Sequence, residues 1–150
     1  MELIWKPNTT VAAVIERDGK FLLVEEDTDD GIRLNQPAGH LDEGESLLAA
    51  CTRETLEETA WHFVPKNLLG IYQWPRTLSD VTYLRFAFTG ELGRHDPDLK
   101  LDHGIHRAIW LGFDEIFTSQ LAHRSPLVLQ CVNDYLAKRQ FPLDLIRHYA

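Results

Sequence analysis

The sequence predicts an α/β protein in which helices cover both faces of a mixed β-sheet. The first observation is the order of elements along the chain: two strands, a helix, three further strands and a closing helix. Helices distributed among strands in this way are typical of a sheet that is covered on both sides. The second observation is the length of 150 residues with 44% hydrophobic side chains, which suits one domain, residues 1–150, around one core.

The N-terminal third of the chain predicts a hairpin followed by loops. Two β-rich runs, Val11–Ile15 and Phe21–Val24, flank an Asp-Gly pair within residues 17–20, and this pair is typical of a tight turn. Residues 27–33 are polar and predict a loop. Residues 34–45 contain one proline and two glycines, so we expect irregular backbone there.

The middle of the chain predicts a helix and two strands. From Ser46 to about Glu58, apolar residues recur at spacings of three and four, the period of a helix, and Ser46 suits its N-cap. Residues 68–74 and 81–92 are β-rich and predict two strands joined by a short connection. Residues 94–105 are polar and predict a second long loop.

The C-terminal third predicts a strand and two helices. Residues 107–113 are β-rich, and Asp114 suits the N-cap of a short helix over residues 114–117. Residues 125–140 predict a closing amphipathic helix with Pro126 in its first turn.

Composition argues against several classes of function. The formal net charge of −8 and a pI near 5.3 disfavour binding to a nucleic acid polymer, which requires basic surface. We see no signal peptide and no apolar run near the ~20 residues of a membrane helix. Cys51 and Cys131 lie outside any metal-binding pattern, so we expect two reduced, buried thiols. These features predict a soluble, cytoplasmic protein acting on small molecules, either as a monomer or as a homodimer.

Acidic side chains are concentrated in residues 37–61. Six carboxylates share this window with one fixed positive charge, Arg53. On a helix, the spacing of Glu54, Glu57 and Glu58 places their side chains on one face. Such a face is either solvated, as on many helices, or neutralised by a cation. Mg²⁺ is the natural candidate for that cation because it prefers hard oxygen ligands.

The spacing of these residues resembles the Nudix box, the signature of the Nudix hydrolase superfamily. The signature reads G-x5-E-x7-R-E-U-x-E-E-x-G-U, where U is a bulky aliphatic residue. The chain matches its first six fixed positions at Gly39, Glu45, Arg53, Glu54, Glu57 and Glu58. At ordinary residue frequencies, a chance match in a chain of this length is on the order of one in 10⁵. Two positions depart: Thr55 stands where an aliphatic residue is usual, and Ala60 where glycine is usual.

The resemblance extends beyond the box. Segments 35–41, 84–86, 124–128 and 135–146 are similar to the phosphatase NudJ subgroup of the superfamily, so the similarity covers most of the chain. It implies a Nudix-type α/β/α sandwich with a mixed β-sheet between helices, in agreement with the order of elements.

The resemblance also implies an activity. NudJ-like enzymes release orthophosphate from nucleoside tri- and diphosphates, and from hydroxymethylpyrimidine diphosphate or thiamine diphosphate, by attack of a metal-activated water. The implied cofactor is Mg²⁺, with Mn²⁺ as a substitute, and the implied partner is a small nucleotide or pyrimidine diphosphate. Two alternatives are a Nudix pyrophosphatase for nucleotide sugars or dinucleotides, and a non-catalytic Nudix-fold module that binds nucleotides.

The resemblance assigns roles to residues of the box. Glu54, Glu57 and Glu58 are the expected metal ligands, together with the backbone carbonyl of Gly39. Arg53 is expected to pair with a neighbouring glutamate and orient it, so Glu54, Arg53 and Glu57 form the expected catalytic set. The remaining residue, Glu45, is expected to organise the junction between loop and helix.

Residues outside the box supply further candidates. The general base is Glu54 or an acid on a later loop, where Asp102 and His103 are available as base or metal ligand. The substrate-binding candidates are polar and aromatic residues near the box and on the later strands: Arg85, Trp74, His40, Gln36 and Arg124. An aromatic ring can stack on a pyrimidine, and an arginine can bind a phosphate with two hydrogen bonds.

Overall fold

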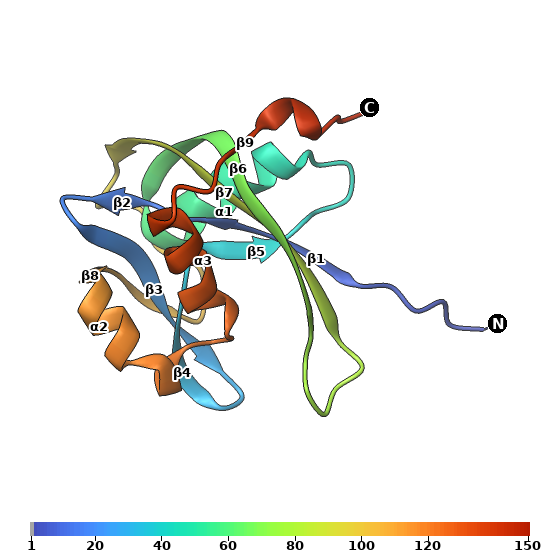
Figure 1. Ribbon diagram of the computed structural model, residues 1–150, viewed down its shortest axis with the longest axis horizontal. Helices are drawn as coiled ribbons and strands as arrows, with labels where there is room; N and C mark the ends of the chain where they lie inside the picture. Colours follow the sequence, from blue (N-terminus) through green and yellow to red (C-terminus); the bar gives the residue numbers. More distant parts are fainter. Residues whose placement is uncertain (1) are drawn as a thin grey trace.

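The computed structural model describes residues 2–150, which form two β-sheets and three α-helices within that range (Figure 1). The first sheet has the order β5-β1-β7-β6-β9. Its strands are β1 (Asn8–Ala13), β5 (Ala38–His40), β6 (Trp61–Pro75), β7 (Thr82–His95) and β9 (Phe141–Pro142). The sheet is mixed, because β1 and β7 run parallel whereas the other pairs run antiparallel.

The second sheet is antiparallel and is organised around one strand. Strand β3 (Lys20–Thr28) pairs with β2, β4 and β8. These partners are β2 (Glu16–Arg17), β4 (Gly31–Asn35) and β8 (Ile105–Gly112). The helices are α1 (Leu47–Thr59), α2 (Phe113–Thr118) and α3 (Leu127–Leu136), and short 3₁₀ turns lie at Gln120–Ala122 and Leu143–Leu145.

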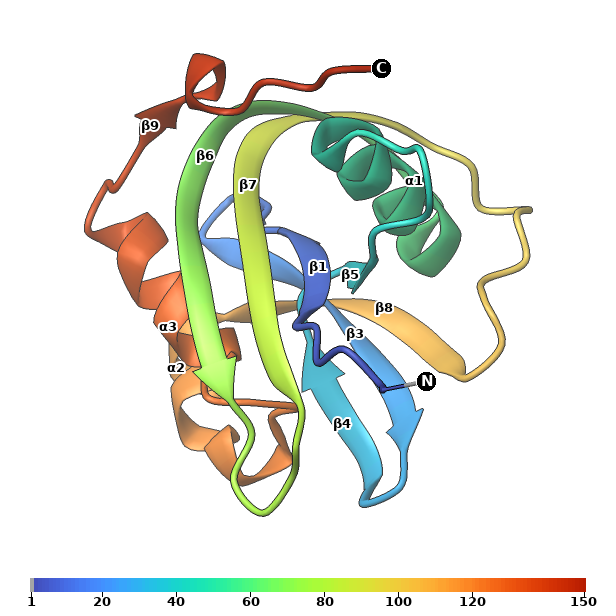
Figure 2. The ribbon, with the colours of Figure 1, turned by 90° about the vertical axis from the view of Figure 1, so that its right-hand side faces the viewer.

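Strand β1 separates two hydrophobic layers. Its neighbouring side chains point to opposite faces, as the pleat of a strand requires. Val11 and Ala13 pack in the layer that includes Cys51 of α1, whereas Ala12 packs with Cys131 of α3. Figure 2 accordingly shows α1 on one side of the sheets and α2 and α3 on the other. The predicted α/β architecture, with a mixed sheet between helices, is confirmed.

Several boundaries differ from those predicted. Residues 27–33 are not a loop: β3 continues to Thr28, and β4 begins at Gly31 after a two-residue turn. The hydroxyl of Thr28 accepts from the N–H of Asp30 and donates to the carbonyl of Gly31, so polar side chains here close a hairpin. The segment expected to be irregular contains β5, which pairs with β1.

The later elements also begin and end at other residues than predicted. Strand β6 begins at Trp61, directly after α1, and forms a long curved hairpin with β7 (Figure 2). The N-cap of α2 is Gly112, and Asp114 lies in its first turn. Helix α3 begins after Pro126 and ends at Leu136, earlier than the pattern indicated.

Helix α1 carries both departures from the signature. The buried hydroxyl of Thr55 donates to the carbonyl of Cys51, 2.8 Å away, so its polarity is satisfied within the helix. Ala60 ends the helix in the left-handed region with φ of 63°, and its N–H donates to the carbonyl of Leu56. Left-handed backbone is unfavourable for a residue with a Cβ, which explains why glycine is usual at this position.

Both cysteines are free and buried, as expected. Among residues 2–150, no helix has the length and apolar character needed to span a membrane.

We predict that Ala60→Gly raises the free energy of unfolding by about 0.5–1 kcal/mol, because relief of left-handed strain exceeds the extra entropy of an unfolded glycine. Ala49→Gly, at an exposed position of α1 with ordinary helical backbone, is the matched control and should lower it by a similar amount. Chemical denaturation of both variants measures the difference. Destabilisation by both substitutions would contradict the strain at Ala60.

Candidate active site

The guanidinium of Arg53 is the centre of a hydrogen-bond network on α1. Its Nε and Nη2 donate to the two carboxylate oxygens of Glu45 at 2.7 and 2.9 Å. Its Nη1 donates to Glu54 at 2.8 Å and to Glu57 at 3.1 Å. Nη2 also donates to the backbone carbonyl of His40, 3.1 Å away, at the end of β5. One side chain therefore ties the preceding loop and β5 to two acids of the helix.

Glu45 lies at the junction between the loop and α1. Besides its two hydrogen bonds to Arg53, its carboxylate accepts from the N–H of Asp42 at 3.1 Å. The hydrogen bonds from Arg53 are the main reason that the pKa of Glu45 is lowered. Glu45 is thus held in its ionised form by the same guanidinium that contacts Glu54 and Glu57.

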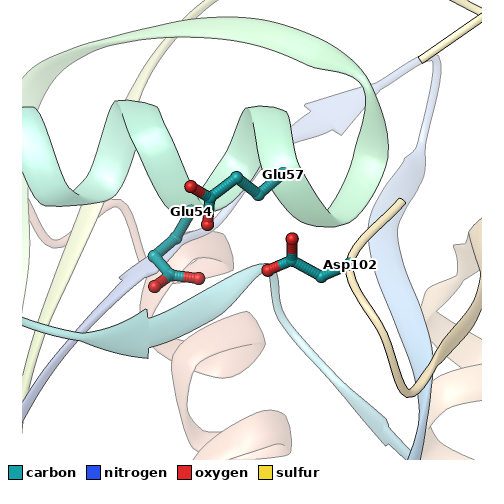
Figure 3. A group of neighbouring side chains, drawn as sticks. All are labelled: Glu54, Glu57 and Asp102. Carbon is teal, nitrogen blue, oxygen red and sulfur yellow. The ribbon is translucent and has the colours of Figure 1, made fainter. Parts of the chain in front are cut away.

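Three carboxylates from two distant segments meet beside α1. Ligand atoms of Glu54, Glu57 and Asp102 lie within 4.8 Å of one another, and Figure 3 shows the three side chains converging. The Asp102 loop is anchored to the helix, because the N–H of Asp102 donates to the carbonyl of Glu57 at 2.9 Å. The carbonyl of Gly104 also accepts from the N–H of Asp27 in β3. The exposed His103 is not part of this cluster.

Burial and the nearby negative charges disfavour the ionised forms of Glu54 and Glu57. Burial is the main cause of a raised pKa at Glu54, and the charges of Glu57 and Asp102 add to it while Arg53 opposes it. The pKa of Glu57 is raised by burial and by Asp102. All donor atoms in the cluster are carboxylate oxygens, which fit a hard divalent cation better than a soft metal.

Glu58 points to a different part of the site. Its carboxylate accepts from the N–H of Ala38 in β5 at 2.9 Å, and the residue is only 7% exposed. Burial raises the pKa of Glu58 to about 9, and the nearby charges of Glu26, Glu54 and Asp102 act in the same direction. Glu58 is therefore separate from the cluster of three, although it lines the same cavity as Glu54.

Gly39 lies where β5 crosses the acids of α1. A Cβ at this position would overlap the carboxylate of Glu54. The backbone of β5 can approach that carboxylate only because residue 39 has no side chain.

A cavity of about 320 Å³ opens beside Glu54 and Glu58. Four of the five predicted substrate residues line it, namely His40, Trp74, Arg85 and Arg124. The fifth, Gln36, lies behind the wall: it is 1% exposed, accepts from Arg85 and donates to the carbonyl of Val128. Tyr72, the cross-strand partner of Arg85, does not line this cavity and donates to Asp134 of α3 at 2.6 Å.

Sequence reasoning missed several residues that line the cavity. They include Thr10, Glu26, Tyr83, Ser125 and Leu127. Tyr83 has a signal in the sequence, because it lies two residues before Arg85 and so on the same face of β7. No comparable signal marks Glu26, since it sits among other acids on β3 and reaches the cavity only through the pairing of β3 with β4.

The chain is similar to known proteins over most of its length. A NUDIX domain model matches residues 6–130. Phosphatase NudJ of Escherichia coli K12 is 38% identical over 144 residues, which cover 95% of this chain and 92% of that protein. A structure described as a NUDIX hydrolase from Nitrosomonas europaea is 55% identical, covers 96% of this chain and 98% of its own, and has a TM-score of 0.93. A structure of a UDP-X diphosphatase shares the fold with a TM-score of 0.71 at 21% identity, over 92% of this chain and 67% of its own.

We predict that, without divalent metal, Glu58 destabilises the protein increasingly as the pH rises. Below pH 4.5, the ordinary pKa of a glutamate, Glu58 is protonated in both the folded and the unfolded state. Between pH 4.5 and about 9, it ionises in the unfolded state but stays protonated in the folded state. The free energy of unfolding of the wild type relative to Glu58→Gln should then fall by up to about 1.4 kcal/mol per pH unit. Denaturation in chelator across this range measures it.

Glu57→Gln is the control for that experiment, because its carboxylate is 38% exposed and solvent screens it. If the difference in the free energy of unfolding between the wild type and Glu58→Gln stays constant with pH, the Glu58 carboxylate ionises normally.

Proposed function

Because the chain belongs to the Nudix hydrolase superfamily, we propose that it is a Mg²⁺-dependent phosphohydrolase that releases orthophosphate from nucleoside tri- and diphosphates and from pyrimidine diphosphates such as hydroxymethylpyrimidine or thiamine diphosphate. The chain is homologous to phosphatase NudJ, and this relationship supports the phosphatase assignment. The named substrates are those of NudJ-like enzymes, and we propose them for this chain because of the homology.

One observation carries the proposal: the carboxylates of Glu54, Glu57 and Asp102 converge within 4.8 Å, beside a cavity that contains two arginines. Like charges repel at such a distance unless a cation lies among them. Arg85 and Arg124 add positive charge to the wall of the cavity, which favours a ligand that carries anionic groups. Acids that bind a cation next to basic residues are suited to a diphosphate.

We assign the metal to Glu54, Glu57 and Asp102, with Glu58 and the carbonyl of Gly39 available on the cavity side. Mg²⁺ held there would neutralise phosphate charge and lower the pKa of a coordinated water. Arg53 holds Glu54 and Glu57 in place, and Glu45 in turn holds Arg53. Because Gly39 has no side chain, the backbone of β5 lies close to the carboxylate of Glu54.

The protein's own groups also supply the proton transfer. A water attacks the terminal phosphorus in line, a new P–O bond forms, and the bridging P–O bond breaks. The water gives its proton to a carboxylate, for which Glu54 and Asp102 are the candidates. Burial raises the pKa of Glu54, and a raised pKa makes a carboxylate a better base. The leaving group is the nucleotide or pyrimidine with one phosphate fewer. The terminal phosphoryl group, which the water attacks, becomes orthophosphate.

We predict that the protein with Mg²⁺ releases orthophosphate from nucleoside diphosphates and from hydroxymethylpyrimidine and thiamine diphosphates. The measurement is identification of products from a panel that also includes a nucleotide sugar and a dinucleoside polyphosphate. A nucleoside monophosphate plus a sugar phosphate would instead identify a pyrophosphatase. Metal binding without turnover of any substrate would identify a binding module.

Two variants tie the activity to the acids of the helix. Glu54→Gln preserves shape but removes a charge next to the metal, and we expect its kcat to fall about a hundredfold or more, because metal interactions contribute several kcal/mol to the transition state. Glu43→Gln, an exposed acid on the adjoining loop, is the control and should retain wild-type turnover. Near wild-type turnover by Glu54→Gln would contradict the assigned site.

A further inference from the structure

A buried arginine fixes the polar wall of the cavity. Arg85 is 5% exposed, and its two terminal nitrogens donate to the side-chain oxygens of Gln36 and Asn35, each at 2.9 Å. Gln36 is held from its other end by a hydrogen bond to the carbonyl of Val128 at 2.8 Å. Because the oxygen of Asn35 faces Arg85, its amide nitrogen must face the opposite way. Arg85 therefore sets the direction in which Asn35 donates.

That donor and the guanidinium of Arg124 both approach one oxygen of Glu26. The amide nitrogen of Asn35 donates to Oε1 of Glu26 at 3.3 Å, and Nη1 of Arg124 lies 3.7 Å from the same oxygen. Within residues 2–150, no donor forms a hydrogen bond with Oε2 of Glu26. Glu26 lines the cavity, so Oε2 is a fixed hydrogen-bond acceptor that is open to a ligand.

The same cavity has a wall that suits a flat ring. Trp74 and Tyr83 are cross-strand partners on β6 and β7, and their rings stack with centroids 5.7 Å apart at 16°. Both line the cavity together with Glu26. Its volume of about 320 Å³ lies at the low end of the range for ligand pockets, roughly 300–1,000 Å³, and suits one ring system beside the diphosphate.

The relative depth of the two charged groups indicates which ring edge fits. The side chain of Glu26 is 17% exposed, whereas that of Arg124 is 38% exposed, so the acceptor lies deeper than the donor. An exocyclic group projects beyond its ring and reaches the deeper group first. An amino group would donate to Glu26 while the neighbouring ring nitrogen accepts from Arg124. A carbonyl in the same place would bring two acceptors together, which is unfavourable.

We propose that Glu26 is a specificity-determining residue that accepts a hydrogen bond from an exocyclic amino group of the substrate's heterocycle. The site then selects amine-bearing rings, such as cytosine or an aminopyrimidine, over rings with a carbonyl at that position, such as uracil. The inference rests on the proposed function, because it concerns the organic part of the same diphosphate substrate.

Binding of a matched pair of ligands tests the proposal without turnover. The probes are the α,β-methylene analogues of cytidine and uridine diphosphate, which differ at the exocyclic amine and the adjacent ring nitrogen. With Mg²⁺ present, calorimetry should give a Kd for the cytidine analogue at least about tenfold lower than for the uridine analogue. Affinities for the wild-type protein that agree within about threefold would overturn the proposal.

Two substitutions assign the preference to one side chain. In Glu26→Gln, the amide oxygen can still accept from Asn35 while its nitrogen faces the ligand as a donor, so the tenfold preference should disappear or reverse. Glu25→Gln is the control, because Glu25 is paired with Arg107 and does not line this cavity. Its preference should equal that of the wild type. A preference that persists in Glu26→Gln would show that another group reads the ring.

The remaining outcomes also decide between the two proposals. If Glu26→Gln fails to fold, Glu26→Asp withdraws the acceptor by one methylene and should weaken the preference to less than about threefold. If the wild type binds neither analogue but hydrolyses other diphosphates, the role of Glu26 is wrong and the phosphohydrolase assignment stands. If no member of the substrate panel is hydrolysed while the preference holds, the ring-reading site is real and the proposed reaction is wrong.

Discussion

The structure depends on a single arginine that makes a cluster of acids compatible with a folded helix. Arg53 donates to Glu45, Glu54 and Glu57, and it reaches the carbonyl of His40 on β5. Without this charge, the carboxylates of α1 would repel one another and the loop before the helix would lose its anchor. The hydrogen bonds also raise the pKa of Arg53 itself, so the guanidinium stays charged throughout the pH range of any assay. Arg53 thus offsets part of the negative charge and leaves the remainder for a cation.

A second arginine organises the opposite side of the cavity by a different physical principle. Arg53 is partly exposed and pairs with carboxylates, whereas Arg85 is buried and donates to neutral amides. A buried charge requires hydrogen bonds to stay in the interior, and the oxygens of Asn35 and Gln36 provide them. The two networks meet at the cavity, which is lined by Glu54 and Glu58 and also by Glu26 and Arg124. In the proposed function, the first network serves the diphosphate and the second serves the ring of the substrate.

The residues of the site whose spacing follows the helical period or the signature could be predicted from the sequence. Glu54 and Glu57 meet because they are three residues apart on a helix, and the signature supplied Glu45 and Arg53 at the right spacing. Asp102 was one of two loop candidates, and only the backbone hydrogen bond from Asp102 to Glu57 shows which of them turns toward the acids. Glu26 was missed because its approach to the cavity depends on pairing between strands, which no local pattern encodes. The same limit explains why β5 and the division into two sheets were not predicted.

The most direct test of the central claim is to locate the metal. Crystals of the protein grown with Mn²⁺ can be measured at the manganese absorption edge, where anomalous scattering identifies the ion. We expect an anomalous peak within coordination distance of carboxylate oxygens of Glu54 and Glu57, and loss of that peak in Glu54→Gln crystals. A manganese peak elsewhere on the surface, with the cluster beside Arg53 empty in active protein, would contradict it.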